Sequence, residues 1–263
     1  MEAVRPPDLE HRRAASGRPP SPRLMALRHA TCRQVGSTCD AIHTPGYRQH
    51  VRLTTAAAML LAAGAATAAD LGSATHFVFD QEAGIHAVQA TWVDELNERL
   101  PEVIRLWDSI APALVEAVTT TTRKPFSRPK TVHLTLADRP SNSFIGVTVN
   151  MRYALRSFTA KPVPMRYKID TVFHEALHEF VSLNTPPRSP LLAQHNSESL
   201  CVRNHLHLLA LQKSALLYTK DLAALEQVVA LDSQLPSGCY RRAWSLVNAT
   251  PNTYLEYVEE LSR

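Results

Sequence analysis

The chain has 263 residues, of which 45% are hydrophobic and 20% charged, and this balance excludes collagen-like, mucin-like and wholly disordered proteins. Nine of the 28 basic residues but only four of the 24 acidic residues precede residue 53, which leaves 19 bases and 20 acids, a net charge of −1, for the rest of the chain. A body with this charge has no polycationic pattern, so we expect no nucleic-acid partner.

The N-terminal region has two parts. Residues 1–50 are rich in Arg, Pro and Ser without apolar periodicity, and we interpret them as a disordered leader or a gene-call artefact ahead of a true start at Val51. Residues 51–68 have the plan of a signal peptide: Arg52, an apolar core, and a small-x-small cleavage site at 66–68. We therefore expect export to the periplasm or beyond (a bacterial chain) and no stable membrane anchor. The alternative is a disordered extension before an Ala-rich internal helix.

Residues 69–263 are expected to form a single α+β domain, mainly helical with a small sheet. Two helices are predicted at 85–100 and 101–118, with Pro101 at the first position of the second helix. Alternating patterns predict strands at 131–136 and 143–151. Helical periodicity then predicts helices at 168–184, 197–218, 221–231, 239–247 and 253–261.

The helix predicted at 168–184 contains the sequence His174-Glu175-Ala176-Leu177-His178, an H-E-x-x-H arrangement. Side chains four residues apart project from the same face of a helix, so both imidazoles can reach one metal ion. Glu175 then stands where it can accept a proton from a water that the metal activates. The alternative is a surface helix with two solvated histidines.

A catalytic zinc site needs a third protein ligand. The metzincin continuation is excluded because Val181 and Asn184 stand where that class has Gly and His. With Glu198 twenty residues after His178, the segment 174–205 resembles the gluzincins, the thermolysin-like zinc metallopeptidases. This resemblance implies a zincin-like fold with Glu198 as the third ligand, although Val202 stands where gluzincins usually have Asp or Asn.

His205 competes for the same role, since seven residues from Glu198 is nearly two helical turns. We expect Glu198 to bind Zn²⁺ with His174 and His178, and His205 to assist catalysis by contacting the substrate oxyanion or a ligand. The resemblance also implies a small twisted sheet over the active-site helix, with the strand at 143–151, or the strand that pairs with it, bordering the cleft. The alternative is that this strand is plain core sheet. Tyr153 and Tyr240 are further candidates that their spacing does not select.

These expectations describe an exported zinc metallopeptidase that hydrolyses peptide or protein substrates, with Glu175 as general base. Two alternatives remain open: a non-catalytic zinc-binding scaffold, and an exported helical interaction protein in which the motif is fortuitous. In an oxidising compartment, Cys201 and Cys239 most simply form one disulfide; the alternative is two buried thiols.

Overall fold

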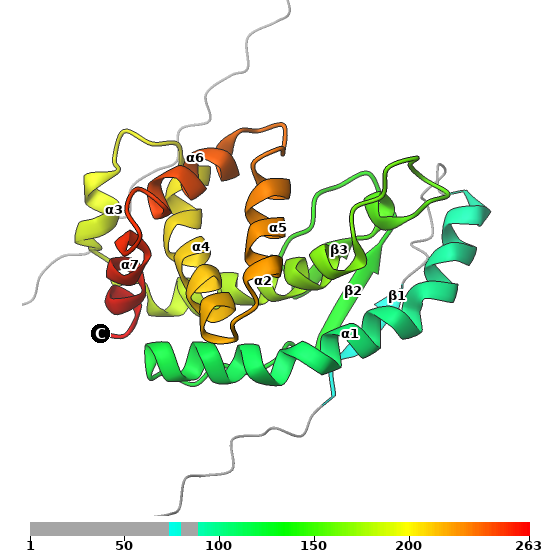
Figure 1. Ribbon diagram of the computed structural model, residues 1–263, viewed down its shortest axis with the longest axis horizontal. Coiled ribbons are helices and arrows are strands. Elements are labelled where there is room, and N and C mark those ends of the chain that lie inside the picture. Colours follow the sequence, from blue (N-terminus) through cyan, green and yellow to red (C-terminus); the bar gives the residue numbers. More distant parts are fainter. Residues whose placement is uncertain (1–73, 80–88) are drawn as a thin grey trace, which may run out of the picture. The chain divides into compact units, whose positions relative to one another are not determined.

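The computed structural model describes residues 74–79 and 89–263, which belong to one compact unit. The leader and signal peptide expected at 1–50 and 51–68 lie outside the described residues. The elements, in chain order, are β1 (His76–Phe79), α1 (Ala90–Thr122), β2 (Thr131–Thr135), β3 (Val147–Asn150), the short 3₁₀ helix η1 (Arg152–Ala154), α2 (Met165–Asn184), α3 (Pro190–Gln194), α4 (Leu200–Tyr218), α5 (Leu222–Asp232), α6 (Cys239–Val247) and α7 (Thr253–Leu261). The expected α+β class is therefore confirmed at this coarse level (Figure 1).

The three strands form one parallel sheet in the order β1-β2-β3. Parallel neighbours need a crossover connection, and α1 supplies the one between β1 and β2. Val132 pairs with Phe77 on one side and Val147 on the other, and its side chain is fully buried. The strand expected at 131–136 is confirmed, whereas β1 was not expected.

The strand expected at 143–151 is shorter, because its first residues form a tight hairpin ahead of β3. Asn142 and Thr148 exchange main-chain hydrogen bonds of 2.9 and 2.8 Å. Gly146 has a φ of +85°, a conformation that side chains rarely adopt, and it turns the chain at the tip. Phe144 and Ile145 at this tip are 93% and 94% exposed.

The expectation of two helices divided at Pro101 is wrong, because α1 runs unbroken through Pro101 and Pro112 (Figure 1). Both prolines lie on the exposed side of the helix. Leu96, Val103 and Trp107 are buried on either side of Pro101 at helical spacing. This continuous apolar stripe holds the helix together across a residue that lacks a main-chain donor.

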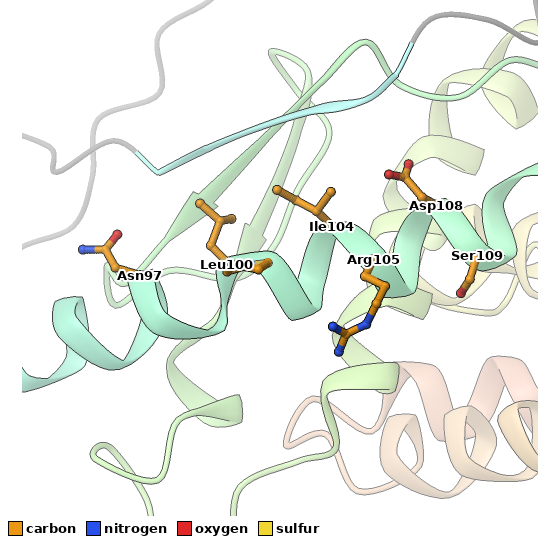
Figure 2. Close-up of a pocket in the computed structure, with 7 residues that line it drawn as sticks. Asn97, Leu100, Ile104, Arg105, Asp108 and Ser109 are labelled. Atoms are coloured by element: carbon orange, nitrogen blue, oxygen red, sulfur yellow. The ribbon is translucent and has the colours of Figure 1, made fainter.

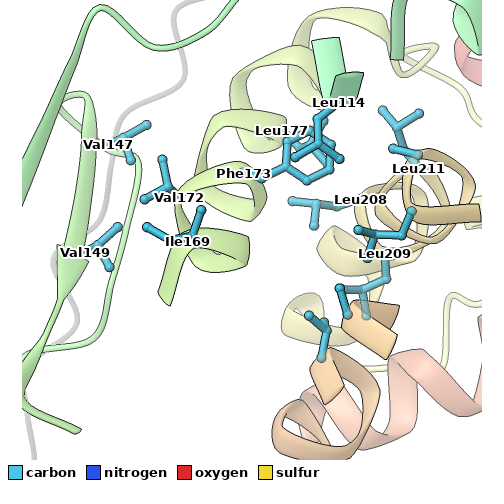
Figure 3. Close-up of a cluster of buried hydrophobic side chains, with 14 of the residues drawn as sticks. Leu114, Val147, Val149, Ile169, Val172, Phe173, Leu177, Leu208, Leu209 and Leu211 are labelled. Carbon is cyan, nitrogen blue, oxygen red and sulfur yellow. The ribbon is translucent and has the colours of Figure 1, made fainter. Parts of the chain in front are cut away.

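Helix α2 lies between the sheet and the other helices. Figure 3 shows Ile169 and Val172 directed toward Val147 and Val149 of β3. On its other side, Phe173 and Leu177 are directed toward Leu114 of α1 and Leu208 of α4 (Figure 3). Packing on both sides fixes the rotation of α2 about its axis and hence the direction of its polar residues.

Helix α4 begins three residues later than predicted. The Ser199 side chain accepts a hydrogen bond from the main-chain N–H of Val202, so Ser199 is the N-cap and Leu200 the first helical residue. Helices α1, α2, α5, α6 and α7 all contact α4, and Leu206, Leu208, Leu209 and Leu211 are fully buried. Within the described ranges, no helix combines the length and apolar character needed to cross a bilayer.

Candidate metal site

Three histidines from two helices come together: His174 and His178 on α2, and His205 on α4. Their ring centroids are 5.1 to 5.5 Å apart in all three pairs, and one ring nitrogen of each lies within 4.8 Å of the others. Nitrogens around a tetrahedral zinc ion lie about 3.3 Å apart, so small rotations of the rings suffice to enclose an ion. This group could hold a metal ion.

Hydrogen bonds that the Nδ1 atoms donate orient two of the rings. The Nδ1 atom of His174 lies 3.1 Å from Oε1 of the buried Gln212, and Nδ1 of His205 lies 2.7 Å from the carbonyl oxygen of Cys201. Because carbonyl oxygens only accept, each Nδ1 carries the proton and each Nε2 keeps its lone pair. Nε2 of His205 is buried without a hydrogen-bond partner, as expected for a nitrogen that could bind a metal ion.

Burial favours the neutral form of all three imidazoles. Burial, with the neighbouring His205 and His178, lowers the pKa of His174 well below its usual value. The pKa of His178 falls to about 4, and that of His205 is also lowered, mainly by burial. Neutral imidazole is the form that binds metal ions, so the environment keeps the group ready to do so near neutral pH.

Glu175 lies beside this group, with Oε2 3.9 Å from Nε2 of His178. The residue is 4% exposed, and this burial raises its pKa to about 8, opposed by a hydrogen bond with the Ser143 side chain. A carboxyl group with its pKa near neutrality is suited to proton transfer. Ser143 belongs to the hairpin ahead of β3, so the segment that leads into the sheet also contributes to this site.

Tyr240 completes the cluster, although the sequence did not single it out over Tyr153. Its hydroxyl oxygen lies 3.5 Å from Nε2 of His174, and its ring centroid lies 4.5 Å from that of His205. Burial raises its pKa, so the phenol remains a neutral donor. Tyr153, in contrast, is 52% exposed and packs on Phe158. No spacing rule connects Tyr240 to the motif, since only the packing of α6 on α4 brings it there.

Glu198, the expected third ligand, takes another partner. It lies before the N-cap of α4, and its carboxylate accepts hydrogen bonds of 3.0 and 2.6 Å from the Arg242 guanidinium. Among the described residues, it joins no group of three whose ligand atoms lie within 4.8 Å of one another. The spacing argument placed Glu198 and His205 on one helix, but the helix begins only at Leu200. The structure brings together His174, His178 and His205 instead.

A cleft of about 1120 Å³ opens beside Glu175 and His178. The hairpin residues Ser143, Phe144 and Gly146 line it, as does Val147 at the start of β3. Its other lining residues come from the loop 125–130, from the C-terminal half of α2, and from Leu192, Arg203, Asn204 and His207. His178, with its side chain 29% exposed, is the histidine of the group that lines the cleft.

A second hollow, of about 790 Å³, lies along one face of α1 (Figure 2). Its lining, from Asn97 to Ser109, contains no histidine and no cysteine. The histidine group beside the larger cleft is therefore the candidate site.

Comparison of the chain with models of protein families, with curated proteins and with solved structures yields no match. The interpretation of the site therefore depends on its own geometry and chemistry.

Proposed function

We propose that this protein is a zinc-dependent peptidase whose metal ligands are His174, His178 and His205. The observation that carries the proposal is the convergence of three neutral imidazoles, those of the buried His174 and His205 and of the partly exposed His178, beside a buried carboxyl group at the wall of a cleft. Three protein ligands with one open position are typical of catalytic zinc sites, whereas structural sites use four. The third ligand differs from the Glu198 that the gluzincin resemblance implied.

The donor set suits zinc. Imidazole nitrogen is a favourable ligand for zinc, and the described group contains no carboxylate or thiolate that would favour calcium, magnesium or an iron–sulfur cluster. Gln212 and the Cys201 carbonyl would hold His174 and His205 in the tautomer that binds through Nε2. A bound zinc ion would supply a Lewis acid and promote ionisation of water near neutral pH.

The neighbouring residues provide the remaining chemistry of hydrolysis. Glu175 would accept a proton from the attacking water and pass it to the leaving amine, and its raised pKa suits both transfers. The neutral Tyr240 hydroxyl, close to His174, would donate a hydrogen bond to the oxygen that gains charge in the transition state. Ser143 would hold the Glu175 carboxylate toward the site.

The substrate class follows from the shape and lining of the cleft. Its volume of about 1120 Å³ exceeds that of a typical small-ligand pocket, and the hairpin ahead of β3, together with Val147, lines it. An extended peptide could therefore lie beside Glu175 and His178. The signal-peptide pattern at 51–68 supports export of the enzyme, and the disulfide between Cys201 and Cys239 is compatible with it.

The decisive experiment compares wild-type protein with Glu175→Gln. Wild-type protein should contain one zinc ion per chain and cleave peptides from a mixed quenched-fluorescence library, with loss of activity to a chelator and recovery with zinc. Glu175→Gln should keep the zinc, because Glu175 is not a ligand, and should cleave at least about 10²-fold more slowly, because it lacks the proton acceptor.

Both halves of this experiment can contradict the proposal. Absence of zinc from protein refolded with excess metal would favour a helical interaction protein with a fortuitous motif. Zinc without hydrolysis would favour a non-catalytic scaffold. Asp170→Asn is a matched control, since Asp170 is a buried acid on the same helix that pairs with Arg166 rather than with the histidines.

A further inference from the structure

The Cys201–Cys239 disulfide lies directly beside the third ligand of the candidate metal site. Cys201 precedes His205 by one helical turn on α4, and its carbonyl oxygen accepts the His205 Nδ1 proton at 2.7 Å. Cys239 begins α6, one residue before Tyr240. The bridge therefore connects the two helices that carry His205 and Tyr240.

The same two sulfur atoms form a second group of potential metal ligands. The Sγ atoms of Cys201 and Cys239 and a ring nitrogen of His205 lie within 4.8 Å of one another. While the sulfurs are bonded to each other, neither can become a thiolate, and only the thiolate is a strong metal ligand. After reduction, these three residues have the donor types of a thiolate–imidazole zinc site.

The backbone geometry suits both states of the pair. The two Cα atoms are 6.1 Å apart, within the usual range for a disulfide. Sulfurs that share a tetrahedral zinc ion lie about 3.8 Å apart, a separation that side-chain rotation alone can reach from this Cα spacing. Cys201 is exposed, so a reductant can reach the bridge, whereas Cys239 and His205 are buried.

We propose that Cys201, Cys239 and His205 form a second metal site, which is closed while the disulfide is intact and binds a thiophilic divalent cation such as zinc once the disulfide is reduced. Reduction by a phosphine gives two thiols and a phosphine oxide, with water supplying the oxygen and the two hydrogens. Metal binding then displaces the two thiol protons. Because His205 belongs to both groups, the reduced protein binds metal at one group or the other. This competition rests on the proposed function, but the existence of the thiolate site does not.

Cobalt(II) distinguishes the two sites by spectroscopy, because thiolate ligands give an intense near-ultraviolet charge-transfer band and imidazoles do not. Oxidised full-length protein should bind one equivalent of cobalt without this band. Protein reduced with a phosphine under anaerobic conditions should develop the band and still bind one equivalent. Two equivalents in the reduced protein would overturn the sharing of His205, and absence of the band would overturn the thiolate site itself.

Variants assign the band to these residues. The Cys201→Ser/Cys239→Ser variant should lose it, whereas Cys32→Ser/Cys39→Ser, which removes the chain's other two cysteines, should keep it. His205→Ala should weaken cobalt binding at least about tenfold in both redox states. His174→Ala should abolish binding only in the oxidised protein. A charge-transfer band that persists in the Cys201→Ser/Cys239→Ser variant would contradict the proposal. If oxidised wild-type protein binds no cobalt but reduced wild-type protein shows the band, only the proposed function is contradicted.

Discussion

Glu198 and His205 differ sharply in what surrounds their side chains. The Glu198 carboxylate already accepts two hydrogen bonds from Arg242, whereas Nε2 of His205 is buried without a partner. His205→Ala should therefore lower zinc affinity by about 100-fold or more, and Glu198→Ala should change it by less than about threefold. Competition with a chromophoric chelator measures both affinities. The reverse order of effects would restore Glu198 as the third ligand.

Burial of Glu175 predicts a pH-dependent stability for the metal-free protein. Its pKa is about 8 in the folded chain but near its ordinary 4.5 when unfolded, so the folded state binds more protons between these values. The contribution of Glu175 is thus fully present below about pH 4.5 and is lost as the pH rises through 8, by up to about 5 kcal/mol.

Glu175→Gln isolates the contribution of Glu175. The lowered histidine pKa values make stability rise with pH, but they are present in both proteins and cancel in the comparison. The free energy of unfolding of Glu175→Gln relative to wild type should increase between pH 5 and pH 8. Urea unfolding of both metal-free proteins at several pH values measures this difference. A difference that stays constant with pH would show that Glu175 titrates normally.

At the scale of elements, α1 contains an internal proline, Pro101, which removes one hydrogen bond from the helix. Pro101 cannot donate to the carbonyl of Asn97, yet the buried stripe of Leu96, Val103 and Trp107 keeps the helix continuous. Pro101→Ala should restore this hydrogen bond and raise the free energy of unfolding by about 1–2 kcal/mol, after allowance for the stiffer unfolded chain of the proline form.

Chemical denaturation measures this gain in the free energy of unfolding. Pro112→Ala is a second test, because Pro112 is also exposed and internal to α1, and it should raise the free energy of unfolding as well. If Pro101→Ala is less stable than wild type, the proline stabilises a bend that the packing of α1 requires.

At the scale of the whole molecule, a bound ion would connect α2 to α4, two helices that meet in the buried core. Zinc at 100 times its dissociation constant should stabilise the folded state by about 2.7 kcal/mol, because the unfolded chain lacks the assembled group. For a chain of this size, the midpoint of thermal unfolding should rise by roughly 5–10 °C.

Thermal unfolding with and without zinc tests this, with the paired variant His174→Ala as a control that should show no increase. An equal increase in that variant would place the stabilising ion elsewhere on the protein.

Patterns of local sequence predicted much of this molecule because they reflect local physics. The strand at 131–135 and the last three helices, including Cys239–Val247 and Thr253–Leu261, follow the predicted ranges closely. The apolar stripe of α2 likewise predicted that His174 and His178 would share a face, since helical geometry alone determines which residues lie together. Elements that depend on partners far along the chain, such as β1 and the unbroken α1, were not predicted.

The sequence by itself determined that two histidines and a glutamate lie within one turn of a helix, because the spacing along a helix is fixed by its hydrogen bonds. Only the tertiary structure decided what meets them. A serine cap at Ser199 starts α4 beyond Glu198, and the packing of α4 and α6 on α2 brings His205, Gln212 and Tyr240 to the site. Those contacts arise from burial of apolar surface that is distributed over the whole chain, so no short stretch of sequence contains them.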